Sequence, residues 1–158
     1  MIRPLALADL PRVLDLWEQL MADGERADPR YRVAADARRV FTPYASEVWT
    51  RVHPFPATWV ADEGGLQGFL GILPQFPLAV LAVPPTALIT DVFVVPGARG
   101  RGLARRMVMT AVESAAQAGY SRVEVGTLSA DVRASGFWQA MGFGAWRTTL
   151  VRSGGAAS

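Results

Sequence analysis

Apolar residues recur at helical spacing in four parts of the chain. The first part follows Asp9, which is suited to an N-cap, and ends near Gly24; its apolar positions are Leu10, Val13, Leu14, Trp17, Leu20 and Met21. The third ends at Gly119, a residue that favours a helix C-terminus, and its apolar positions are Leu103, Met107, Ala111, Ala115 and Ala118. The fourth covers residues 131–141 and stops before Gly142. These three parts are predicted to form amphipathic helices, and the second part is also helical in pattern.

The second helical part allows two starting points. Its apolar side carries Tyr44, Val48, Trp49 and Val52. One interpretation begins the helix at Thr42 and Pro43, which resemble an N-cap and the first helical residue. The other begins a longer helix at Asp36 and kinks it at Pro43. The pattern does not choose between them.

Short apolar runs predict the strands of a sheet. They occupy residues 1–7, 58–61, 68–73, 87–95, 121–125 and 147–152. The second and third runs are separated by a glycine-rich segment, which predicts a β-hairpin. Residues 76–86 are apolar and interrupted by prolines. They form either a buried, self-packed loop or one wall of a substrate pocket.

Composition fits one α+β domain. At 158 residues, of which 51% are hydrophobic, the chain can bury a core of its own. We expect the domain to cover residues 1–152 and the polar, glycine-rich residues 153–158 to be a disordered tail. The aromatic side chains outside the motifs discussed below are expected in the core; they are Trp17, Trp49, Trp59, Tyr31, Tyr44 and Phe76.

Several functions are excluded by residue types. The chain has no cysteine, which excludes disulfides, thiolate metal sites and a cysteine nucleophile. The single histidine, His53, cannot form a histidine cluster, and no metal site is expected. The formal net charge is only +2, so no broad basic face for nucleic acid is predicted.

A membrane span is not expected either. The segment between Gly64 and Thr90 carries no charge, but its prolines at 74, 77, 84 and 85 would break a spanning helix. The N-terminus lacks the basic and apolar regions of a secretory signal. A cytoplasmic location is the default expectation.

Residues 89–104 join a predicted strand to a predicted helix through Gly97, Gly100 and Gly102. The first N–H groups of a helix have no partner within it and lie at the positive end of its dipole. Glycines let the backbone approach a ligand closely, and Arg99 and Arg101 add positive charge. The segment is therefore predicted to bind a diphosphate.

Two motifs resemble the GCN5-related N-acetyltransferase (GNAT) superfamily. Arg99, Gly102 and Ala104 fit its Arg/Gln-x-x-Gly-x-Gly/Ala signature on the same strand-to-helix turn. A second segment matches the spacing of its Asn-x-x-Ala-x-x-Phe-Tyr-x-x-Leu-Gly-Phe pattern, with Asp131, Ala134, Phe137, Trp138, Met141, Gly142 and Phe143. The opening IRPLALADLPRVLDLW is also similar to the family. The resemblance thins in residues 25–56 and 74–86.

The resemblance implies a mixed, mostly antiparallel sheet of about six to seven strands flanked by about four helices. It also implies acetyl-CoA, with the pyrophosphate on the backbone of Arg99, Gly100, Arg101, Gly102, Leu103 and Ala104. The pantetheine would follow Phe93, Val94 and Val95, in the gap where this strand separates from the strand at residues 122–125. Relatives often form dimers, so a homodimer is compatible with it.

The implied reaction is direct transfer of the acetyl group from acetyl-CoA to a primary amine of a small molecule or peptide. Because an alkylammonium has a pKa near 10.4, a base must remove its proton at neutral pH. Asp91 is the candidate base, directly or through water. The resemblance assigns oxyanion stabilisation to a backbone N–H near Val92 or Phe93.

Two positions depart from the family pattern. Trp138 stands where a tyrosine often protonates the leaving thiolate, and an indole cannot deliver that proton. We interpret Trp138 as an aromatic that packs over the cofactor or in the core, and Ser135 or Tyr120 as possible helpers. Asp131 replaces asparagine and brings a negative charge near the cofactor.

Two other interpretations were compared with an acetyltransferase. A dinucleotide-binding turn has a similar glycine spacing, but Arg105 occupies its third glycine position and no strand-helix-strand unit opens the chain. A non-catalytic acyl-CoA-binding domain on the same fold remains an alternative, because of Trp138 and Asp131.

Overall fold

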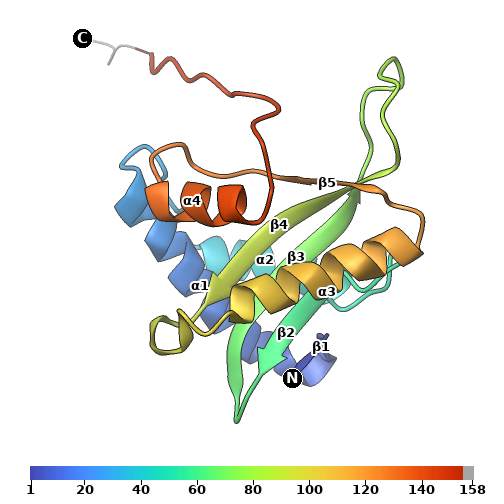
Figure 1. The fold of residues 1–158 in the computed structure, drawn as a ribbon. Helices are drawn as coiled ribbons and strands as arrows, with labels where there is room; N and C mark the ends of the chain where they lie inside the picture. Colours follow the sequence, from blue (N-terminus) through green and yellow to red (C-terminus); the bar gives the residue numbers. More distant parts are fainter. Residues whose placement is uncertain (155–158) are drawn as a thin grey trace.

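A single five-stranded sheet runs through the molecule, as the computed structural model shows for residues 1–154 (Figure 1). The strands follow each other across the sheet in the order β1 (Ile2–Pro4), β2 (Thr58–Asp62), β3 (Leu66–Gln75), β4 (Thr86–Val94) and β5 (Arg122–Val125). The first four pair antiparallel, whereas β4 and β5 run parallel. The predicted α+β class and the β2–β3 hairpin are confirmed.

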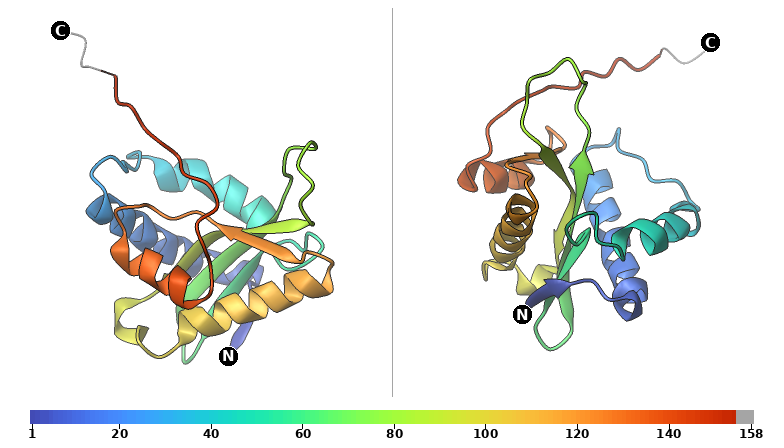
Figure 2. Two further views of the ribbon diagram at one scale, coloured as in Figure 1. Left: turned by 45° about the horizontal axis from the view of Figure 1, so that its top comes forward. Right: turned by 90° about the vertical axis from the view of Figure 1, so that its right-hand side faces the viewer.

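Helices cover both faces of the sheet (Figure 2). On one face lie α1 (Leu10–Ala27) and α2 (Ala37–Tyr44), preceded and followed by the short turns η1 (Leu7–Asp9) and η2 (Ala45–Trp49). On the other lie α3 (Leu103–Gln117), which follows η3 (Pro96–Ala98), and α4 (Val132–Ala140). Four helices around one sheet agree with the expected architecture.

Each face of the sheet has its own hydrophobic core. Between the sheet and α1, the side chains of Val13 and Leu14 are buried. Between the sheet and α3, Met107 and Ala111 are fully buried. These residues occupy the predicted apolar stripes, so burial of those stripes fixes how α1 and α3 lie on the sheet.

The second helix begins early. It starts at Ala37 and contains Pro43, so the longer helix is the right interpretation and an N-cap at Thr42 is wrong. The Thr42 hydroxyl donates to the Arg38 carbonyl one turn earlier, at 2.7 Å. Proline removes one backbone donor, and the helix widens into the π-helical turn η2 directly after it.

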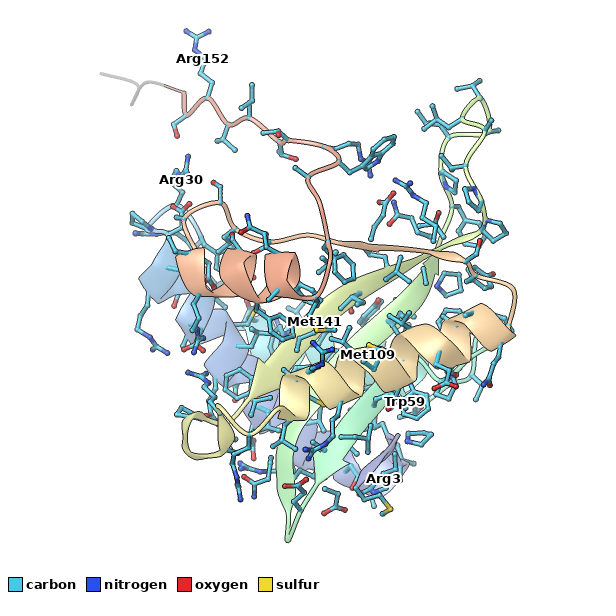
Figure 3. All side chains as sticks on the ribbon, viewed as in Figure 1. Arg3, Arg30, Trp59, Met109, Met141 and Arg152 are labelled. Atoms are coloured by element: carbon cyan, nitrogen blue, oxygen red, sulfur yellow. The ribbon has the colours of Figure 1, made fainter. Side chains whose placement is uncertain are left out.

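The sheet has five strands rather than six or seven. Residues 147–152, predicted as the last strand, pair with no strand in the described part of the chain, and the Leu150 side chain is 89% exposed. Figure 3 shows Arg152 far from the sheet on this extended segment. A strand forms only where another strand supplies hydrogen bonds, which local sequence does not reveal. Of the tail expected at 153–158, residues 155–158 lie outside the described residues.

The apolar segment 76–85 is exposed and extends beyond the sheet (Figure 1). Phe76 is 89% exposed, so neither a buried loop nor a place for Phe76 in the core is found. Tyr44 is also exposed, whereas Trp17, Trp49 and Trp59 are buried as expected. Prolines at both ends of this loop limit strand pairing there.

A β-bulge in β4 changes which residues face which helices. Gly71 pairs with Asp91 and the next residue, Ile72, pairs with Ile89, so Thr90 has no partner on β3. An extra residue reverses the alternation of side chains along a strand. Ile89 accordingly lies in the core under α3, whereas Phe93 lies in the core under α1.

Candidate active site

A cavity of about 750 Å³ opens where β4 and β5 separate. Their pairing ends at Ile89 and Val125, and the next residues of both segments line the cavity. Residues of α1, α3 and α4 complete its walls. The predicted gap between these two strands is therefore present, and it is large enough for an extended ligand arm.

The glycine-rich turn lies at one end of this cavity. Gly100 and Gly102 have φ angles of 75° and 73°, a left-handed conformation that glycine adopts without steric cost. The first helical hydrogen bond of α3 runs from the Arg106 N–H to the Gly102 carbonyl. Within residues 1–154, the backbone N–H groups of residues 100–105 have no hydrogen-bond partner. They form a set of free donors at a helix N-terminus, which suits a phosphate.

The Arg99 side chain turns away from this turn and toward α1. Its Nη2 pairs with the Asp23 carboxylate at 3.0 Å, and its Nε donates to the Val94 carbonyl at 2.9 Å. The guanidinium carbon lies 5.5 Å from the ring centre of Phe93. Arg99 thus connects α1 to the end of β4, while its backbone remains part of the turn.

Some of the other predicted cofactor residues line the same cavity, whereas Arg101 and Val95 do not. Phe93, Val94, Leu103 and Ala104 line it, and their positions follow from the end of β4 and the start of α3. Arg101 is exposed and its carbonyl accepts from Arg106. Val95, half-buried, donates its N–H to the Gln67 carbonyl at 2.8 Å.

Asp91 lies in the cavity wall at the bulge. An added Cβ on its pairing partner Gly71 would lie 2.5 Å from the Thr90 hydroxyl oxygen and 3.2 Å from Asp91 Oδ2, so only glycine leaves room for both side chains. Burial raises the pKa of Asp91 above its usual value, although a hydrogen bond with Thr90 opposes this shift. A carboxylate with a raised pKa is a stronger base, which suits proton removal.

Trp138 is 8% exposed and lines the cavity from α4. Its ring lies edge-on to those of Phe137 and Phe143, at 4.9 and 5.0 Å between ring centres. Asp131 Oδ1 accepts from the Ala134 N–H at 2.9 Å and so caps α4. Trp138 therefore packs in the aromatic core beside the cavity, as interpreted from the sequence.

The two hydroxyl groups suggested as substitutes for a general acid lie elsewhere. Tyr120 packs edge-on against Phe55, and neither it nor Ser135 lines the cavity. Among the cavity residues, hydroxyl groups belong to Tyr31, Thr90 and Thr127. Only the phenol of Tyr31 titrates in an accessible range, and burial together with Asp91 raises its pKa.

Sequence reasoning missed the α1 side of the cavity. Tyr31 lines it, and the Tyr31 hydroxyl donates to the Met21 sulfur at 3.2 Å. A Cβ at Gly24 would lie 2.7 Å from the Tyr31 ring, so the ring packs directly on the backbone of α1. The one available signal was Gly24 within a strongly amphipathic helix, because a mid-helix glycine often allows close packing.

Comparison of the sequence with models of protein families decides the family. The sequence model of the acetyltransferase (GNAT) family matches residues 14–143, which include both motifs and the cavity walls. The chain belongs to the GNAT acetyltransferase family. It is an acetyl-CoA-dependent N-acetyltransferase, and acetyl-CoA is its cosubstrate.

Several solved structures share the fold at low sequence identity. Aminoglycoside N-acetyltransferase AAC(6')-Iy in complex with CoA has a TM-score of 0.74 and 18% identity, covering 99% of this chain and 95% of that one. The AAC(6')-IG enzyme of Acinetobacter haemolyticus has a TM-score of 0.75 and 15% identity, covering 98% of this chain and 97% of that one. A tetramutant of the BH1408 protein of Bacillus halodurans has a TM-score of 0.77 and 14% identity, covering 97% of this chain and 99% of that one. No curated protein matches the chain by sequence.

The described part of this acetyltransferase offers neither a metal site nor a membrane span. Residues 1–154 contain no group of three or more His, Asp or Glu side chains arranged to hold a metal ion. Within the same residues, no helix is both long and apolar enough to cross a bilayer.

Proposed function

We propose that this acetyltransferase acts on a primary amine of a small molecule or peptide, with Asp91 as the base. The observation that carries the proposal is the position of Asp91, whose carboxylate lies in the same cavity as the free N–H groups of the turn. The aminoglycoside acetyltransferases that share the fold support a small-molecule acceptor.

Acetyl-CoA would supply a thioester acetyl group, and the chain offers fitting contacts for the rest of the molecule. The backbone of residues 99–104 provides donors for the pyrophosphate, and the left-handed Gly100 and Gly102 have open space where a Cβ would be. The unpaired edge of β4, at Phe93, Val94 and Val95, would run alongside the pantetheine amides. Asp131 already caps α4, so its charge is directed toward the helix backbone.

Asp91 would accept a proton from the acceptor ammonium. The amine nitrogen then forms a bond to the acetyl carbon as the carbon–sulfur bond breaks, and the electron pair stays on sulfur. A backbone N–H near Val92 or Phe93 would stabilise the carbonyl oxygen during this step. The thiolate then takes the second proton that the bonded nitrogen loses, so the products are the acetamide, CoA thiol and one proton released through Asp91 to solvent.

Trp138 leaves the thiolate without a general acid of the usual kind. A thiol has a pKa near 8.5, so its anion leaves without protonation more readily than an alkoxide would. Loss of a general acid lowers the rate by about 10² to 10⁴, so turnover is reduced but not abolished.

Replacing Asp91 tests the proposal. We expect Asp91→Asn to lower kcat by about 10² to 10⁴ at neutral pH, since the amide cannot accept the proton. Affinity for CoA, measured by calorimetry, should change less than twofold. Glu113→Gln, an exposed change on α3, is the matched control and should retain full activity.

Two results would contradict the proposal in different ways. Full activity of Asp91→Asn with a good acceptor would exclude Asp91 as the base. Binding of CoA without turnover of any amine in a broad panel would instead indicate an acyl-CoA-binding protein that has lost transfer activity.

A further inference from the structure

Ion pairs neutralise part of the charge around the cavity. Three aspartates and three arginines line it: Asp23, Asp91, Asp131, Arg99, Arg105 and Arg133. Asp23 pairs with Arg99 at 3.0 Å and with Arg133 at 3.6 Å, and it also pairs with Arg26. Asp131 is directed to the backbone of α4. Within the described residues, neither Asp91 nor Asp131 forms an ion pair with an arginine, and Asp91 is the one of the two that does not cap a helix.

The wall beside Asp91 is aromatic and apolar. Tyr31 lines the same cavity as Asp91, and the pKa of its phenol is raised by burial and, to a lesser extent, by the charge of Asp91. Next to the Tyr31 ring, Met21 and Leu20 of α1 complete the wall. Glu25 is the other carboxylate near Tyr31, but it is exposed, accepts from the Val33 N–H and does not line the cavity.

This arrangement suits one positive charge attached to an apolar body. A carboxylate and an aromatic ring that line the same cavity can both attract an ammonium group, the first by charge and the second by cation–π interaction. A second ammonium would meet either the apolar wall, where it has no partner, or Arg105, whose guanidinium forms no ion pair within the described residues and would repel it. An amine that carries a carboxylate would be repelled by Asp91 itself.

We propose that the acceptor is a monoamine with an apolar body, bound with its ammonium between Asp91 and the Tyr31 ring and its body against Leu20 and Met21. This inference rests on the proposed transfer to an amine. It separates this chain from an enzyme for polycationic acceptors such as an aminoglycoside.

Gly24 leaves room for the Tyr31 ring beside the proposed position of the acceptor ammonium. Because a Cβ at this position would lie 2.7 Å from Tyr31 Cε1, Gly24→Ala displaces the ring from α1. The expected result is a rise of about tenfold in KM for the monoamine, with KM for acetyl-CoA changed less than twofold. A rise in both constants together would indicate general disruption of the cavity and would count against a specific acceptor subsite.

The decisive experiment compares acceptors that differ in one charge. Hexylamine and 1,6-diaminohexane share a chain length, and phenethylamine and phenylalanine share a ring. We expect kcat/KM to favour hexylamine over the diamine, and phenethylamine over phenylalanine, by at least tenfold. Equal values, or a preference for the diamine or kanamycin, would overturn the inference while leaving acetyl transfer intact. Failure of all these amines would contradict the proposed function instead.

A charge added to the apolar wall should change the preference. Met21→Glu supplies a partner for a second ammonium, so the ratio of kcat/KM for hexylamine to that for diaminohexane should fall at least tenfold. A ratio is independent of the fraction of folded enzyme, so lowered stability does not obscure it. Gln19→Glu adds the same charge on the exposed side of α1 and should leave the ratio unchanged. An unchanged ratio in Met21→Glu would overturn the placement of the acceptor body.

Discussion

The direction of the Asp91 carboxylate depends on the neighbouring residues that leave space for it. Its pairing partner Gly71 has no side chain, and Thr90 is the extra residue of the bulge. Without that extra residue, alternation would place Asp91 on the same face as Ile89, under α3. The bulge therefore directs the carboxylate to the side of the sheet where Tyr31 lies, and the acidic residue alone would not reach the cavity wall described here.

Gly71→Ala tests this dependence. The added Cβ would lie 2.5 Å from the Thr90 hydroxyl oxygen and 3.2 Å from Asp91 Oδ2, so both side chains must move. We expect kcat to fall at least tenfold, because a base displaced by about an ångström loses its alignment. The KM for acetyl-CoA should stay within twofold in steady-state assays.

Gly136→Ala is the control for Gly71→Ala. Gly136 lies in α4 and is exposed, and nothing lies within 4 Å of an added Cβ. Alanine should therefore preserve activity. Comparable kcat values for the two variants would show that the position of Asp91 is not set by Gly71.

At the scale of the elements, the turn between β4 and α3 creates the site for an anion. Left-handed backbone at Gly100 and Gly102 turns successive N–H groups of residues 100–105 away from internal partners. Helix α3 is fixed by its buried stripe, including Met107 and Ala111, so the donors at its N-terminus keep their direction.

Gly102→Ala should weaken acetyl-CoA binding. A left-handed conformation costs an L-residue about 1–2 kcal/mol, so the free turn will relax and binding must restore it. That cost corresponds to a rise of roughly 5- to 30-fold in the Kd for CoA, measured by calorimetry. The kcat at saturating acetyl-CoA should remain near that of the unchanged enzyme.

Gly97→Ala serves as the comparison for Gly102→Ala. Gly97 belongs to η3, has no positive φ and has open space around it, so alanine should keep the CoA affinity. If Gly102→Ala bound CoA as tightly as Gly97→Ala, the conformation of the turn would not determine cofactor affinity.

At the scale of the whole molecule, the Asp91 carboxylate that we propose as the base lowers stability at neutral pH. Burial raises the pKa of Asp91 in the folded protein above its value in the unfolded chain. The folded state therefore binds this proton more tightly, and the stabilisation it brings at low pH is lost as pH rises through the folded-state pKa. At neutral pH the ionised group is buried at a cost, which is common at catalytic sites.

The stability of Asp91→Asn should reveal this cost. We expect its Tm at pH 7 to exceed that of the unchanged protein, and the difference to shrink as pH falls toward 4. Scanning calorimetry across this range measures both trends, with Glu113→Gln as the reference for removal of an exposed charge. A lower Tm at pH 7 would mean that contacts of the carboxylate outweigh its desolvation.

Periodicity in the sequence determined the secondary elements that pack on their neighbours. The stripes of α1 and α3 bury their predicted residues, because an apolar face is stable only against another apolar face. Residues 147–152 have a strand-like pattern but no partner strand in the described part of the chain. The apolar residues of 76–85 remain mostly exposed. Local pattern describes what a segment could pair with, whereas pairing depends on residues distant in sequence.

The sequence by itself determined the family and predicted a phosphate-binding turn and a candidate base, because each depends on residues within short segments. Tertiary structure alone decided how Asp91 is used: a bulge opposite Gly71 turns it toward Tyr31, which lies 60 residues away along the chain. The same folding neutralised Asp23 with three arginines and left Asp91 without one. The charge that an acceptor meets follows from such long-range pairing, which no motif encodes.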